Sequence, residues 1–178
     1  MEEGMTQEPA ERGYTCARCG RYHGDLPYAY GLDAPDPWRP EYARDSRNRL
    51  GEEQCEIVTL GSQFIRGIIV IPVKENDETF EWGVWCAVDL ASYNRASDIW
   101  DDPGRDKEPP FSGQLASELG IYIEPTFALE LTVRTRALGL RPSFLLEDAR
   151  HPLVVEQREG ISRDRVVEIA TLIMHDGV

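Results

Sequence analysis

Two long apolar runs, separated by a four-residue polar turn, constrain the fold of this chain more than any other feature. The first run, Gln63–Val73, contains the β-branched segment IRGIIVIPV, and the second, Thr79–Leu90, reads TFEWGVWCAVDL. β-Branched and aromatic residues favour strands, and the acidic stretch ENDE at 75–78 is typical of a turn. The sequence therefore predicts an antiparallel hairpin at the centre of the fold.

Further strands are predicted on both sides of this hairpin. Cys55–Leu60 is a short candidate strand, and RPSFLLE at 141–147 is another. Between them, Thr126–Leu138 shows the clearest alternation of apolar and polar residues, which is the period of a half-buried strand. Because strands come in groups without regular strand–helix alternation, we expect an α+β fold with a mostly antiparallel sheet packed by helices.

Three helices are predicted from their N-terminal capping residues. Asp89 and Ser162 each precede a helical pattern of apolar residues, and their side-chain oxygens can accept backbone N–H groups. Ser112 and Gly120 are typical start and stop residues, and they predict a short helix at 112–119.

The length of 178 residues suits one domain. Residues 1–12 (MEEGMTQEPAER) lack periodicity and are predicted to be a disordered tail, whereas residues 13–176 are predicted to form a single α+β domain. The tail has no positive region followed by an apolar run, so no signal peptide is expected. Ile65–Val73 is too short to span a bilayer, and the cytoplasm is the expected location.

The chain is strongly acidic, with 32 Asp and Glu residues against 19 Lys and Arg residues and a net charge of −13. This charge opposes binding to nucleic acids and to anionic membrane surfaces. The partner is unknown from sequence. The simpler reading of the charge is that it keeps the protein soluble, and the alternative is that it suits a basic protein as partner.

One short segment, residues 13–31, concentrates cysteine and histidine. Cys16 and Cys19 form a C-x-x-C pair, His23 follows closely, and Cys55 lies further along the chain. In a reducing compartment such a set favours metal over disulfides, and Cys3His is a typical ligand set of a closed structural zinc site. We therefore predict an N-terminal zinc knuckle. Cys55 is alternatively a core thiol, in which case water could fill an open site.

Other polar residues are weaker candidates for a ligand or partner surface. Arg66, Arg134 and Arg136 fall on predicted strands and could form an anion pocket or a self-paired sheet face. His151 lies near Glu156 and is either a general base or a structural loop histidine. The chain carries no G-x-S-x-G, Walker A, dinucleotide-binding glycine or H-E-x-x-H motif. No catalytic residue is predicted.

Several spaced motifs resemble a bacterial family catalogued as domain of unknown function 2199. They are C-x-x-C-G-x-x-H-x-D-L-P at 16–27, WGVW at 82–85, WDDPGR at 100–105 and HPLVVEQREGI at 151–161. The resemblance extends from about Tyr14 to Ile173. It implies membership of a family without an established activity.

These observations together predict a zinc-stabilised binding or interaction domain without catalysis. Two alternatives remain open at this point. The first is an acidic inhibitor or immunity-type protein that covers a basic partner, which the charge favours. The second is a zinc-dependent hydrolase-like enzyme, which would require an open metal site.

Overall fold

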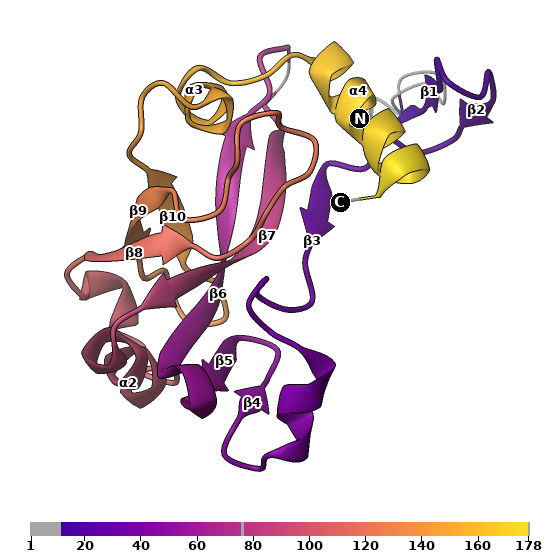
Figure 1. Ribbon diagram of the computed structural model, residues 1–178. Helices are drawn as coiled ribbons and strands as arrows, with labels where there is room; N and C mark the ends of the chain where they lie inside the picture. The colour runs from indigo at the N-terminus through magenta and orange to yellow at the C-terminus, as the bar shows by residue number, and fades with distance from the viewer. Residues whose placement is uncertain (1–11, 76, 178) are drawn as a thin grey trace, which may run out of the picture.

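The predicted central hairpin is present and forms the framework of the fold (Figure 1). In the computed structural model, which describes residues 12–75 and 77–177, strand β6 (Ser62–Pro72) pairs antiparallel with β7 (Thr79–Val88). The two strands stay in register from Gln63 opposite Val88 to Pro72 opposite Thr79. The prediction of an antiparallel hairpin from these two runs is therefore confirmed.

Three more strands close this hairpin into a barrel. β8 (Phe111–Leu115) pairs antiparallel with β7, β9 (Glu130–Arg134) pairs with β8, and β10 (Ser143–Leu146) pairs with β9. β10 then runs parallel to β6, with Ser143 opposite Ile68. The predicted α+β class is confirmed and most strand pairings are antiparallel, but the sheet is mixed and closes on itself through this parallel contact, so it is not simply an antiparallel sheet.

Shorter strands extend the barrel on both outer edges of the hairpin. β5 (Gln54–Ile57) pairs antiparallel with β6, and β4 (Arg49–Leu50) pairs with β5. β3 (Ala29–Gly31) runs parallel to β7. β3 leads back along the chain to a separate two-stranded hairpin, β1 (Tyr14–Thr15) and β2 (Tyr22–His23).

Two of the predicted helices form where their capping residues indicate. α2 (Leu90–Asp98) begins after Asp89, whose carboxylate accepts the Ser92 N–H at 2.7 Å. α4 (Arg163–Asp176) begins after Ser162, whose hydroxyl accepts the Arg165 N–H at 3.2 Å. A further helix, α3 (Pro152–Glu159), was not predicted. Short 3-10 helices occupy Pro40–Arg44, Val58–Leu60 and Arg105–Lys107.

The predicted helix at 112–119 is wrong, because residues 111–115 form strand β8. β8 pairs with β9 along its length and with β7 at its end, where Leu115 lies opposite Cys86. These pairings come from residues distant in sequence. They override the local preference that Ser112 and Gly120 indicate, as tertiary contacts commonly do.

The hydrophobic core has two parts, on opposite faces of β7. Trp82 belongs to the larger cluster, which fills the barrel and continues to α3, α4 and the β1–β2 hairpin. Trp85 belongs to the smaller cluster beneath β5 and β6. Both indole rings are fully buried. The alternation of side chains along β7 thus packs one face of the strand into each cluster.

The described part of the chain begins at Arg12, close to β1. Of the predicted tail at 1–12, residues 1–11 lie outside the described residues. The Arg12 carbonyl accepts the Leu26 N–H at 2.9 Å, so the chain is already bonded to the fold at that residue. Within residues 12–75 and 77–177, no helix has the length and apolar character needed to cross a membrane.

Candidate metal centre

The β1–β2 hairpin positions the three N-terminal candidate ligands. Tyr14 lies opposite His23 and Thr15 opposite Tyr22, so the strands end where Cys16 begins the connecting turn. The Cys16 N–H donates to the Arg21 carbonyl at 2.9 Å. His23 lies opposite Tyr14, two residues before Cys16, so side-chain alternation places Cys16 and His23 on the same face of the hairpin.

The turn between the strands needs a glycine. The Gly20 N–H donates to the Cys16 carbonyl at 2.8 Å, and Gly20 has a φ of +70°. This left-handed backbone conformation costs a residue with a Cβ atom about 1 kcal/mol or more, whereas glycine adopts it freely. The turn folds Cys19 back toward Cys16, which is the arrangement that a C-x-x-C zinc knuckle requires.

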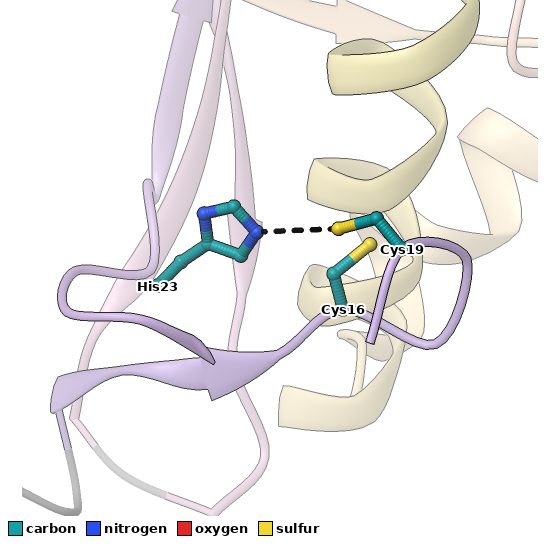
Figure 2. Close-up of side chains that lie close together, drawn as sticks. All are labelled: Cys16, Cys19 and His23. Carbon is teal, nitrogen blue, oxygen red and sulfur yellow. Dashed lines mark hydrogen bonds between the residues drawn. The ribbon is translucent and has the colours of Figure 1, made fainter. Parts of the chain in front are cut away.

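The side chains of Cys16, Cys19 and His23 converge. Their nearest ligand atoms all lie within 4.8 Å of one another, and the Cys19 Sγ lies 3.9 Å from the His23 Nε2. Figure 2 shows the imidazole and both sulfurs directed toward one another. Two thiolates and one imidazole form a ligand set that suits Zn²⁺. The structure therefore contains a group of three residues able to hold a metal ion.

Backbone amides favour the thiolate form of one of these ligands. The pKa of the Cys16 thiol is lowered to about 6. The largest cause is a hydrogen bond that the Cys19 backbone amide donates to the Cys16 sulfur. Hydrogen bonds to a charged form stabilise that form, and only the thiolate binds metal. The turn thus prepares Cys16 as a ligand before any ion binds.

The ring of His23 is oriented by an aromatic neighbour. Tyr14, directly opposite it across the hairpin, stacks on His23 with a centroid separation of 5.0 Å and an interplanar angle of 25°. Tyr14 is buried in the main core cluster. The contact therefore fixes the imidazole against a rigid part of the protein, as outer-shell contacts do in metal sites.

Cys55, the predicted fourth ligand, does not join this group. It lies on β5, opposite Phe64 of β6, and is fully buried in the smaller core cluster with Trp85. Burial raises the pKa of its thiol to about 12. Cys55 therefore has the surroundings of a core thiol, which was the alternative reading of this residue. Cys86 is also fully buried, in the larger cluster.

A histidine that sequence reasoning missed lies beside the cysteines. The Nε2 of His175, at the end of α4, is 3.2 Å from the Cys16 Sγ, although 159 residues separate the two. The sulfur raises the pKa of the His175 ring. No spacing motif links such distant residues. The sequence did offer one signal. A closed zinc site needs four ligands, and the chain has only three histidines, so each of them was a possible ligand.

The predicted pair of His151 and Glu156 is engaged elsewhere. His151 caps α3: its Nδ1 accepts the Leu153 N–H at 3.1 Å, and its Nε2 lies 3.1 Å from the Glu124 carbonyl. Glu156 accepts hydrogen bonds from Tyr122 and Arg165. His151 is a buried residue, 6% exposed, and both of its ring nitrogens have partners, which is the arrangement of a structural histidine.

The three candidate arginines do not form one pocket. Arg66 lies 5.7 Å from the Trp85 ring centroid and lines a surface cavity of about 580 Å³ together with Arg141. Arg134, at the end of β9, is exposed, and neither it nor Arg136 lines that cavity. A neighbouring cavity of about 490 Å³ is lined by Arg105 and Arg141, which sequence reasoning did not single out.

Comparison with known families identifies the chain. A family model described as "Uncharacterized protein conserved in bacteria (DUF2199)" matches residues 15–161. The protein belongs to the DUF2199 family. The match confirms the resemblance stated above and covers the hairpin with Cys16, Cys19 and His23. His175 lies beyond the DUF2199 match. No curated protein and no solved structure matches the chain.

Proposed function

We propose that this DUF2199 protein is a zinc-stabilised binding domain in which the metal has a structural role. The observation that carries the proposal is the convergence of Cys16, Cys19 and His23 to within 4.8 Å on one tight turn. Structural zinc sites use this kind of thiolate and imidazole set. The lowered pKa of the Cys16 thiol further supports metal binding near neutral pH.

The metal would stabilise a part of the fold that has few interactions of its own. Strands β1 and β2 contain two residues each, and an isolated two-stranded hairpin of that size is marginal in water. Tyr14, Cys16 and Leu26 nevertheless belong to the main core cluster. A bound ion would therefore hold buried side chains in place and stabilise the fold by an amount on the order of several kcal/mol.

The contacts of the candidate acid–base residues favour binding over catalysis. His151 and Glu156 are each held by structural hydrogen bonds, as described above. The hydrolase-like alternative needs water as a zinc ligand. That alternative therefore depends on whether the metal has a fourth protein ligand.

The partner that we propose is a basic protein in the cytoplasm. The net charge of −13 favours a partner of opposite sign through long-range attraction. The four cysteines carry free thiols, which suits a reducing compartment. An inhibitor or immunity-type role is one form of this proposal. Recovery of a basic partner from a lysate at low salt, with its loss at high salt, would support it.

Metal analysis of the purified protein tests the zinc site directly. We expect about one equivalent of zinc, and chelation should lower the melting temperature. The variant Cys19→Ser should bind zinc far more weakly, whereas Cys86→Ser, a matched change at a buried cysteine outside the site, should retain it. Metal-free protein with a melting temperature that does not respond to chelator or to added zinc would contradict the proposal.

A further inference from the structure

We propose that His175 completes the metal site as its fourth ligand. This inference rests on the proposed zinc site and adds a second imidazole from the opposite end of the chain. The ion would then be held by two cysteines and two histidines in a closed Cys2His2 set. Neither the three-residue group nor the family match includes His175.

Two separations between a sulfur and a nitrogen are close to those expected in a tetrahedral zinc site. Zinc bonds of about 2.3 Å to sulfur and about 2.1 Å to nitrogen separate a sulfur ligand from a nitrogen ligand by about 3.6 Å at tetrahedral angles. The Cys16 Sγ lies 3.2 Å from the His175 Nε2, and the Cys19 Sγ lies 3.9 Å from the His23 Nε2. Each cysteine is thus paired with one imidazole at a separation close to that of two ligands of one ion.

The placement of His175 follows from how α4 is attached to the hairpin. At its N-terminal end, Arg163 donates to the Gly13 carbonyl at 2.7 Å. At its C-terminal end, Arg18 forms an ion pair with Asp176 at 2.5 Å. Both ends of α4 are therefore bonded to the segment that carries the cysteines, and Figure 2 shows this helix, in yellow, directly behind the two sulfurs.

Packing also holds α4 beside the hairpin. Val166, Ile169 and Ala170 are buried in the main core cluster, which also contains Cys16. Burial of this stripe holds α4 against the core that contains Cys16. His175 lies on the opposite side of the helix from the stripe at about 3.6 residues per turn, so its position beside Cys16 rests on the 3.2 Å contact at the helix end. His175 itself is exposed at the helix end, so its replacement should not disturb the core.

A closed site has two consequences. Four protein ligands leave no position for water, so the zinc would be structural and the hydrolase-like alternative would lose its reactive group. The ion would also join residues 159 positions apart. Such a link closes nearly the whole chain into a loop, which disfavours the unfolded state. The metal would therefore fasten the N-terminal hairpin to the C-terminal helix.

The test compares full-length zinc-loaded protein with four variants, the fourth being Cys55→Ser. X-ray absorption should show two sulfur and two imidazole ligands in the unaltered protein. His175→Gln should lose one imidazole and bind zinc at least about 100-fold more weakly, because even outer-shell changes cost about 10–100-fold. His175→Cys should restore tight binding with three sulfurs. Met174→Gln, a change at the exposed neighbouring residue, should keep both imidazoles.

The outcomes distinguish a failure of the His175 assignment from a failure of the proposed zinc site. If the unaltered protein binds no zinc, the zinc-stabilised domain itself is wrong. If the unaltered protein binds zinc and His175→Gln keeps both the affinity and the second imidazole, only the assignment of His175 fails. A loss of one sulfur ligand in Cys55→Ser would overturn the assignment in favour of Cys55.

Discussion

The ring of Phe144, on β10, lies directly against the backbone of Gly67, on β6. A Cβ atom added at Gly67 would lie 2.3 Å from the Cζ of Phe144. The ring is fully buried in the main core cluster. Absence of a side chain at residue 67 is therefore what lets the aromatic ring fill the barrel beside the parallel β10–β6 contact.

Gly67→Ala should destabilise the protein by about 1–3 kcal/mol, because the added methyl group overpacks a closed core. Denaturant unfolding measures the change. Gly24→Ala is the matched control, since nothing lies within 4 Å of a Cβ atom at that residue, and it should change stability by less than about 0.5 kcal/mol. Equal stability of the two variants would contradict the packing described here.

Metal removal should loosen the two ends of the chain and leave the barrel intact. Hydrogen exchange of the zinc-loaded protein, with and without chelator, checks this. We expect faster exchange in residues 14–23 and in the last turns of α4, because the proposed ion would join these segments. Amides of the β6–β7 hairpin should exchange at unchanged rates. Faster exchange throughout the barrel, with none confined to the two ends, would contradict the proposed site.

His151→Ala should destabilise the fold by about 1 kcal/mol, since it removes the cap that accepts the Leu153 N–H. His151→Asn should recover much of this loss, because asparagine is an effective N-cap. Thermal unfolding of the two variants provides the comparison. An unchanged melting temperature for His151→Ala would show that the capping contact is unimportant and would reopen other roles for this histidine.

Tyr122 should make a contribution to stability that depends on pH. Burial, followed by the neighbouring Glu156 carboxylate, raises the pKa of the Tyr122 phenol above its ordinary value of 10. The folded protein therefore holds this proton more tightly than the unfolded chain does. The contribution is fully present below pH 10 and is lost as the pH rises toward and through the raised value.

Tyr122→Phe tests this dependence. The variant loses the 2.6 Å hydrogen bond to Glu156, and at pH 7 it should be less stable by about 1–3 kcal/mol. Above pH 10 the difference between the two proteins should shrink, because the unaltered protein loses its advantage. Denaturant unfolding between pH 7 and pH 11 measures both effects. Parallel stability profiles would refute the prediction.

The features that the sequence predicted correctly depend on residues close together in the chain. The β6–β7 hairpin is joined by a short polar turn, and the two confirmed helices begin at caps that bond within three residues. The convergence of Cys16, Cys19 and His23 also arises within one turn of eight residues. Such local interactions need no knowledge of the rest of the fold.

The features that the sequence did not predict depend on contacts between distant segments. The parallel β10–β6 contact closes the barrel, and strand pairing on both sides converts residues 111–115 from a predicted helix to β8. The same reason separates the two candidates for the fourth ligand. Cys55 and His175 are both compatible with zinc chemistry, but burial against Trp85 removes the first, and the packing of α4 brings the second to Cys16. The local sequence thus determined the convergence of three residues able to hold a metal ion. The tertiary structure decided what lies beside them, because His175, 159 residues from Cys16, is placed by the packing of its helix and not by the motif.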